Sequence, residues 1–262
     1  MKLRRRPTVA VLPLAGVIGV PGRGSGRALT YEAVAPGIER AFRYRRLEAV
    51  ALSINSPGGS AVQSARIADR IRRLGEEKGV PVLSFVDDVG ASGGYWLACA
   101  GSEIFVHPAS ILGSIGVIFA GFGFDGAIAR LGIERRVHAL GERKGMLDPF
   151  RPERPEDVEV LRAMQEDIHD VFIEWVRERR GVRLKEEGND LFSGRVWTGR
   201  QAVELGLADG LGEMRQVVRE RFGKRVRLRV ALRRRRRFPL LPALPGLADA
   251  VEERLLWARY GL

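Results

Sequence analysis

A strand, a glycine-rich turn and a helix occur twice in succession, and this repeat constrains the fold more than any other feature. The apolar run at 48–54 predicts a strand, and the apolar residues of 61–74 recur at helical spacing. A second apolar run at 80–86 predicts another strand, and the compact apolar stretch at 95–100 predicts another helix. Because strands that alternate with helices form parallel βαβ units, we expect an α/β protein whose functional site lies where neighbouring strands end.

The second turn places Ser92 between an alanine and two glycines, just before a predicted helix. Its hydroxyl is uncrowded, and the free N–H groups at a helix start stabilise an anion. This is typical of a nucleophile elbow, although the usual Gly-x-Ser-x-Gly pattern is not matched; a serine that only caps the helix is the alternative. The first turn contains Gly58 and Gly59, and we expect it to face Gly93 across neighbouring strands, where N–H groups of both turns could hold an oxyanion.

The rest of the chain extends the same architecture. We expect a first strand within 9–20, helices over 30–46, 125–131, 155–180, 198–205 and 213–221, and strands over 103–106, 134–139 and 226–232. The N-terminal segment is basic at 1–6 and apolar afterwards, so it also resembles a secretory signal. Pro13 interrupts the apolar run, however, and we favour a strand there. No unbroken apolar span of about 20 residues is available for a transmembrane helix. The single cysteine, Cys99, excludes an intramolecular disulfide and is expected to be buried.

Positive charge is concentrated at two places in this chain of 262 residues, whose net charge is +12. Residues 224–237 hold nine basic residues and no acidic one, and a smaller basic run lies at 2–6. Such segments are attracted to anionic lipid head groups by about 1 kcal/mol per residue; a solvated or nucleic-acid-binding surface is the alternative. We expect one domain over 1–232 and a tail over 233–262 that is basic, then proline-rich, and amphipathic over 247–260. That tail would lie on a membrane, bind the body of the fold or dock a partner.

Lys144 lies in a glycine-bounded loop near apolar residues such as Met146 and Phe150. Burial there would disfavour its charged form, so that a neutral amine could accept a serine proton. An ordinary surface lysine beside Glu142 is the alternative. Residues 121–126 match the dinucleotide fingerprint Gly-x-Gly-x-x-Gly, but they come after several βα units rather than at the first turn, so we do not expect a nucleotide site.

Six motifs, by their order and spacing, resemble the bacterial signal peptide peptidase A family (protease IV), whose members are serine–lysine peptidases. The motifs are VLPLAGVI at 11–18, INSPGG at 54–59, ASGGY at 91–95, GSIGV at 113–117, GRVWTG at 194–199 and LGLADGLG at 205–212. The match covers most of 8–212. It implies a ClpP/crotonase-like fold of repeated βα units with a single catalytic domain.

The resemblance assigns a role to each residue of the candidate site. Ser92 would be the nucleophile, and Lys144, 52 positions later, the general base. Ser114 would orient the lysine amine, and the N–H groups of Gly59 and Gly93 would form the oxyanion hole. Substrate would be bound by three residues of the same motifs: Gly58, Ile115 and Gly116.

The implied reaction is acyl transfer from a peptide carbonyl to Ser92, then hydrolysis by water that the same amine activates. Hydrophobic peptides such as signal peptide remnants, bound as an added strand, would be the substrates, with no metal or cofactor. The resemblance also implies a homo-oligomeric ring, such as an octamer, in which adjacent subunits can supply the serine and the lysine of one site. Family members usually carry an N-terminal membrane anchor, which this sequence lacks, so we expect a location in the cytoplasm or peripherally on an anionic membrane.

Three other functions stay open. A ClpP-type peptidase needs a histidine base, but His107 lies only 15 positions after Ser92, about ten short of the ClpP-type spacing. A crotonase-like acyl-CoA enzyme shares the fold and the oxyanion geometry but does not need Ser92 or Lys144. A non-enzymatic basic scaffold that binds a membrane surface or nucleic acid would explain the charge, but the basic run has no interleaved aromatic residues to stack on bases.

Overall fold

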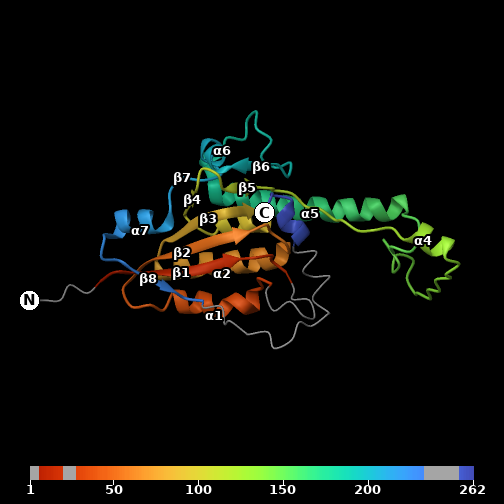
Figure 1. The fold of residues 1–262 in the computed structure, drawn as a ribbon, viewed down its shortest axis with the longest axis horizontal. Coiled ribbons are helices and arrows are strands. Elements are labelled where there is room, and N and C mark those ends of the chain that lie inside the picture. Colours follow the sequence, from red (N-terminus) through yellow and green to blue (C-terminus); the bar gives the residue numbers. More distant parts are fainter. Residues whose placement is uncertain (1–5, 20–27, 233–253) are drawn as a thin grey trace, which may run out of the picture. The chain divides into compact units, whose positions relative to one another are not determined.

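The computed structural model describes residues 6–19, 28–232 and 254–262 (Figure 1). The chain divides into unit 1, which joins Met1–Ile115 to Ile173–Leu262, and unit 2, Gly116–Phe172. Unit 1 holds the sheet and most of the helices. The predicted boundary between catalytic domain and tail falls at residue 232, and the next 21 residues lie outside the described ranges, so this boundary stays a prediction.

Unit 1 is built on an eight-stranded, mainly parallel sheet, which confirms the predicted α/β class. Its main path runs β6-β5-β3-β2-β1-β8, with β4 on β3 and β7 on β4 beside that path. The β5–β6 pair is antiparallel, and the other pairs are parallel. The strands are β1 (Thr8–Ala15), β2 (Leu47–Ser56), β3 (Val82–Ala91), β4 (Glu103–Val106), β5 (Ile111–Gly113), β6 (Val196–Thr198), β7 (Gly210–Leu211) and β8 (Arg227–Val230). Because β2, β3 and β5 are parallel neighbours, their carboxyl ends meet at one edge.

Helices pack on both faces of this sheet. In unit 1 they are α1 (Tyr31–Ala41), α2 (Ala61–Lys78), α3 (Gly93–Ala98), the last part of α5 (Pro155–Arg180), α6 (Gly199–Glu204) and α7 (Met214–Phe222). On one face Phe85 belongs to the cluster that packs around Val218 of α7. On the other face α1 packs closely on the sheet, because a Cβ added to Gly37 of α1 would stand only 3.3 Å from a methyl carbon of Leu12 in β1. Four of the described helices begin after residues whose side-chain oxygens accept a backbone N–H: Thr30, Ser60, Thr198 and Glu213.

Unit 2 contains α4 (Asp125–Arg130), the first part of α5 and long irregular segments. The strand predicted over 134–139 is wrong: these residues are mostly exposed, and no described strand pairs with them. An isolated strand has no stabilising partner, so the apolar pattern alone could not fix it. Helix α5 has the predicted bounds, but Met164 and Val171 on its apolar face are exposed in the single chain.

Other local predictions differ in detail. Strand β3 continues beyond the predicted end at Val86, because its last residues pair with β5 while Asp87 remains exposed. Helix α1 runs through Pro36 and ends five residues before the predicted end. Val62, predicted to face inward from α2, is 67% exposed.

Cys99 is free and fully buried, as predicted. Among the described ranges, no helix has both the length and the apolar character needed to cross a bilayer. Half of the amphipathic helix predicted over 247–260 lies outside the described residues, and in the described half 254–258 are helical.

Candidate active site

Ser92 stands where β3 ends and α3 begins, in a strained backbone conformation. Its φ of 51° lies in the left-handed region, which costs a residue with a side chain about 1–3 kcal/mol. Its N–H donates to the carbonyl of Gly113 (2.8 Å), and its own carbonyl accepts from the N–H groups of Tyr95 (2.9 Å) and Trp96 (3.0 Å). The hydroxyl makes no cap on α3, so the alternative of a purely capping serine is not what the structure shows. The backbone is held firmly while the half-buried hydroxyl stays available.

Ser114 lies beside this serine. Strands β3 and β5 pair in register, with Ala91 opposite Gly113, so the two serines follow paired residues of adjacent parallel strands. Ser114 has the same φ of 51°, and its N–H donates to the carbonyl of Arg195 on the segment that enters β6 (2.7 Å). The structure therefore brings Ser92 and Ser114 together, as the resemblance implied.

The first glycine turn faces the serine turn, which confirms the expectation from the sequence. A Cβ placed on Gly58 would stand 2.7 Å from Cβ of Ser92 and 2.9 Å from N of Gly93. A Cβ on Gly93 would stand 3.4 Å from N of Gly59. The two turns are therefore in direct contact across the ends of β2 and β3.

The N–H groups of Gly59 and Gly93 donate to no residue in the described part of the chain. Gly93 is the first residue of α3, whose early N–H groups lack helical acceptors. At the other turn, Ile18 donates to the carbonyl of Gly58 (2.8 Å) and accepts from the N–H of Ser60 (2.7 Å), which leaves the N–H of Gly59 between them unused. Two close N–H groups that donate to no described residue, beside a serine hydroxyl, are an arrangement that could hold an oxyanion.

Two side chains at the end of β2, to which the sequence alone assigned no role, hold these turns in place. The hydroxyl of Ser56 donates to the carbonyl of Gly16 (2.7 Å) and accepts from the N–H of Gly58 (3.2 Å). The amide of Asn55 donates to Asp88 (2.7 Å) and accepts from the N–H of Val89 (3.1 Å). Both residues belong to the INSPGG motif, so the motif itself was the signal that could have identified them.

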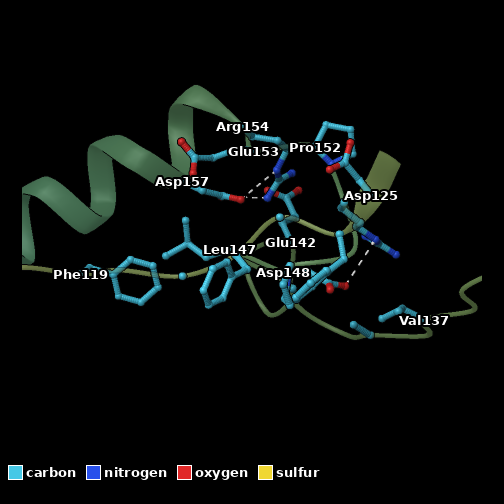
Figure 2. Close-up of a pocket in the computed structure, with 18 of the residues that line it drawn as sticks. Phe119, Asp125, Val137, Glu142, Leu147, Asp148, Pro152, Glu153, Arg154 and Asp157 are labelled. Carbon is cyan, nitrogen blue, oxygen red and sulfur yellow. Dashed lines mark hydrogen bonds and ion pairs between the residues drawn. The ribbon is translucent and has the colours of Figure 1, made fainter. Parts of the chain in front are cut away.

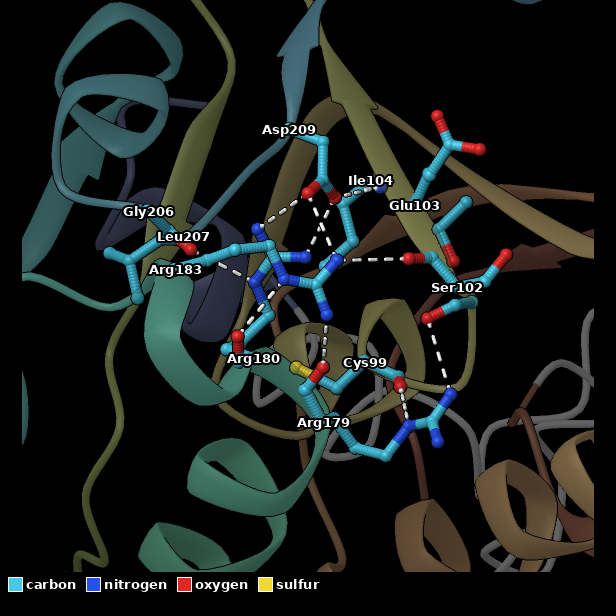
Figure 3. Close-up of polar contacts among 12 residues, drawn as sticks. Cys99, Ser102, Glu103, Ile104, Arg179, Arg180, Arg183, Gly206, Leu207 and Asp209 are labelled. Carbon is cyan, nitrogen blue, oxygen red and sulfur yellow. Dashed lines mark hydrogen bonds and ion pairs between the residues drawn. The ribbon is translucent and has the colours of Figure 1, made fainter.

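A buried ion pair lies beneath α3 (Figure 3). Arg180 is 2% exposed, and it donates to both carboxylate oxygens of Asp209 (2.7 and 3.1 Å) and to the carbonyl of Gly206 (2.9 Å). Burial raises the pKa of Asp209, but the hydrogen bonds and positive charge of Arg180 outweigh it and hold that pKa below its ordinary value. Asp209 belongs to the LGLADGLG motif, but no sequence pattern indicates its pairing with Arg180.

The end of α5 also supplies donors to the far end of α3. The indole N–H of Trp175 donates to the carbonyl of Trp96 (3.1 Å), and Arg179 donates to that of Cys99 (2.9 Å). The hydroxyl of Tyr95 donates to a carbonyl of the turn before β7 (2.8 Å). Burial raises the pKa of the Cys99 thiol to about 12, so this cysteine stays neutral and unreactive near pH 7. These contacts fix the short helix that carries Ser92 at its start.

Lys144 lies in unit 2, in a turn closed by its N–H and the carbonyl of Gly141 (3.0 Å). Its side chain is exposed in the single chain, so the burial among apolar groups considered for it is absent there. Gly116 also belongs to unit 2, whereas Ile115 is buried in unit 1 with the two serines and the glycine turn. The candidate base and the candidate nucleophile therefore belong to different units.

The loop that carries Lys144 borders a cavity of about 1120 Å³ within unit 2 (Figure 2). Asp148 closes this loop, because its carboxylate accepts from Nε of Arg135 (3.0 Å) and from the N–H of Phe150 (3.1 Å). The N–H of Phe150 is the main reason that the pKa of Asp148 lies below its ordinary value. Two of the three fingerprint glycines, Gly121 and Gly123, line the same cavity. No strand leads into the fingerprint in the described residues, unlike in a dinucleotide site.

His107, the rival base, lies in the turn after β4. Its Nδ1 accepts from the N–H of Ala109 (3.2 Å), and the residue lines a groove of about 820 Å³ together with Asp87. Ser92 is absent from the lining of that groove. A histidine-based site at Ser92 therefore gains no support.

A strained serine with a free hydroxyl, next to two unused N–H groups at the ends of parallel strands, is typical of enzymes that transfer an acyl group through serine. The sequence profile of Peptidase family S49 matches residues 75–225. The chain belongs to peptidase family S49, which confirms the resemblance.

Several known proteins are similar over long stretches. The Na(+)/H(+) antiporter NhaA of Brucella abortus is 44% identical over 272 residues, covering 97% of this chain and 37% of that protein. The putative signal peptide peptidase SppA of Enterococcus faecium is 30% identical over 168 residues, covering 64% of this chain and 48% of that protein. The chain thus spans less than half the length of these two curated relatives.

Among solved structures, a lysine-to-alanine mutant of the 1510-N membrane-bound stomatin-specific protease, in complex with a substrate peptide, superposes with a TM-score of 0.53. It is 15% identical, and the match covers 96% of this chain and 98% of that one. The likeness shows the predicted ClpP/crotonase-like fold.

Proposed function

We propose that the chain is an endopeptidase that uses a serine–lysine dyad, with Ser92 as nucleophile and Lys144 as general base. The observation that carries this proposal is the free hydroxyl of Ser92 beside the unused N–H groups of Gly59 and Gly93. Ser114 would orient the lysine amine through its hydroxyl, and the register of β3 and β5, which brings the two serines to adjacent strand ends, supports this role.

The proposed reaction has two acyl-transfer steps. The neutral amine of Lys144 takes the proton of Ser92 as the oxygen attacks the peptide carbonyl, and the resulting oxyanion accepts from the two glycine N–H groups. The protonated amine then gives its proton to the leaving amine of the peptide. A water molecule, deprotonated by the same lysine, releases the acyl group. The solved neighbour supports a lysine of this kind, because it carries a lysine-to-alanine mutation and holds a substrate peptide.

We further propose that the working form is a homo-oligomeric ring, such as an octamer, in which a neighbouring copy supplies the lysine. Support comes from unit 2, which exposes large apolar side chains in the single chain: Ile118, Phe119, Phe122, Leu131 and Leu140. Apolar surface of this kind is unusual in a monomer and marks an interaction site. Covering it with a second copy would also remove water from around Lys144, as a neutral amine requires.

Extended hydrophobic peptides, such as signal peptide remnants, are the proposed substrates, with Gly58, Ile115 and Gly116 at the binding site. The name of the Enterococcus faecium relative supports this class. The N–H and carbonyl of Gly58 already bond to Ser56 and Ile18 in the single chain, so its best supported contribution is the space that it leaves beside the nucleophile.

The test is hydrolysis of hydrophobic peptides by the wild type and by the Ser92→Ala and Lys144→Ala variants. We expect both variants to fold, by circular dichroism, and to lose about a thousandfold or more in turnover, as triad members do elsewhere. Ser193→Ala and Lys185→Ala change exposed residues of the same types and serve as matched controls that keep full activity. Turnover retained by either dyad variant would contradict the assignment.

A further inference from the structure

The starts of three neighbouring strands collect positive charge at the edge of unit 1 opposite the candidate active site. Strands β2, β1 and β8 lie side by side and run parallel, with Thr8 paired to Leu47 on one side and to Arg227 on the other. The residues just before these strands therefore share one edge. Six basic residues occupy it, and we call them the basic edge: Arg6, Arg45, Arg46, Lys224, Arg225 and Arg227.

Hydrogen bonds of the backbone hold the basic edge in a fixed shape. The N–H of Thr8 donates to the carbonyl of Arg46 (3.0 Å), whose φ of 60° is itself in the left-handed region. The N–H of Arg227 donates to the carbonyl of Pro7 (2.9 Å). A tight turn from Gly223 to Val226, closed by a bond of 3.0 Å, presents the two basic residues between them.

These cations are exposed, and none of them forms an ion pair with a described residue. This contrasts with the arginines of α2, where Arg66, Arg70 and Arg72 all pair with carboxylates. A hollow of about 520 Å³, lined by Arg46 and Glu48 among others, lies at the same edge. In the sequence Lys2, Arg4 and Arg5 directly precede Arg6 and add to the charge.

We propose that the basic edge docks on the surface of an anionic lipid bilayer. Each basic residue near such a surface raises the binding constant about fivefold, and a row of unpaired cations on a rigid edge can contact it together. Single-stranded nucleic acid fits less well, because it needs aromatic faces on which bases stack. The nearby aromatics are engaged: Phe222 packs on the core cluster, and the hydroxyl of Tyr44 donates to the carbonyl of Val230 (3.3 Å).

Docking through the basic edge sets the distance between Ser92, the candidate nucleophile, and the lipid surface. Strands β2 and β3 have ten residues each, so at about 3.3 Å per residue the turns at their carboxyl ends stand roughly 30 Å from the lipid surface. The enzyme would then act on peptide segments that have left the bilayer. This consequence rests on the proposed function of Ser92, whereas the docking itself does not.

The test is co-sedimentation of the full chain with phosphatidylcholine vesicles that contain or lack phosphatidylserine. The variant Arg45→Ser/Lys224→Ser/Arg225→Ser removes three charges from the basic edge. The variant Lys185→Ser/Arg200→Ser/Arg215→Ser removes three exposed, unpaired charges elsewhere in unit 1 and is the matched control. We expect the first to weaken binding to anionic vesicles by about a hundredfold, and the control to change it only slightly. High salt should remove the difference.

Two results would overturn the proposal: equal binding of the two triple variants to anionic vesicles, or equal binding of the wild type to neutral and to anionic vesicles. So would an edge variant that loses affinity for a DNA oligonucleotide but not for vesicles, since the edge would then be a nucleic-acid surface. The arginines at 233–237 are present in both variants, so their contribution cancels. Peptide hydrolysis in solution should stay unchanged in both, which keeps this test separate from that of the dyad.

Discussion

Because Gly58 has no side chain, the side chain of Ser92 can occupy the space beside it. Replacing Gly58 with alanine therefore perturbs the site without changing a reactive group. The added Cβ would stand 2.7 Å from Cβ of Ser92, 2.9 Å from N of Gly93 and 3.0 Å from the carbonyl oxygen of Ala91. Carbon atoms in ordinary contact lie about 3.5–4.0 Å apart. The serine turn and the glycine turn must therefore separate by roughly 1 Å.

Two costs follow from this geometry. The φ of 104° at Gly58 suits glycine and costs alanine about 1–3 kcal/mol of folding stability. A displacement of about 1 Å at a reacting group lowers turnover by about a hundredfold. We therefore expect Gly58→Ala to lose about two orders of magnitude in kcat/KM for a hydrophobic peptide, together with moderate destabilisation.

Gly79→Ala is the matched control, because Gly79 also has a positive φ (60°) but nothing lies within 4 Å of its would-be Cβ. It should cost about 1 kcal/mol in stability and leave kcat/KM unchanged. The assay is peptide hydrolysis, with thermal unfolding of both variants alongside. Wild-type turnover by Gly58→Ala would refute the inferred contact between the two turns.

Three further predictions follow from named contacts. Asp209→Asn leaves a buried arginine without its counter-charge and should destabilise the fold by about 3–5 kcal/mol in urea titrations. Because folding lowers the pKa of Asp209, the ionised carboxylate stabilises the folded state at pH values above its unfolded pKa of about 3.9. This stabilisation is lost as the pH falls further, through the folded-state pKa. The Asp209→Asn variant should therefore lose less stability in acid than the wild type does. Mixing Ser92→Ala with Lys144→Ala chains during refolding should restore peptidase activity if one site takes its dyad from two copies, and no recovery would contradict that arrangement. Trp175→Phe removes one donor to the carbonyl of Trp96 and should cost about 1 kcal/mol in thermal unfolding, a loss that an unchanged melting temperature would disprove.

The sequence was sufficient for those parts of the fold that depend on local pattern. The glycine turns, the cap at Thr198 and the bounds of α5 all rest on residue types that act within a few positions. The contact between the two turns could be predicted as well, because parallel strands end at a common edge. The order of the motifs then identified the family.

The parts that were missed depend on partners distant in the chain. Strands β5, β6 and β7 have only two or three residues each, too few for a pattern, and exist because neighbouring strands pair with them. The ion pair of Arg180 and Asp209 joins residues 29 positions apart, and neither position signals the other. Lys144 is exposed in the single chain, and its proposed role depends on a second copy rather than on a local pattern.

The most direct test of the central claim is to incubate the wild type with a fluorophosphonate probe and locate the adduct by peptide mass mapping. We predict a single covalent adduct on Ser92, formed much more slowly in Lys144→Ala. An adduct on another residue, or hydrolysis of peptides that continues while Ser92 stays unlabelled, would contradict the account.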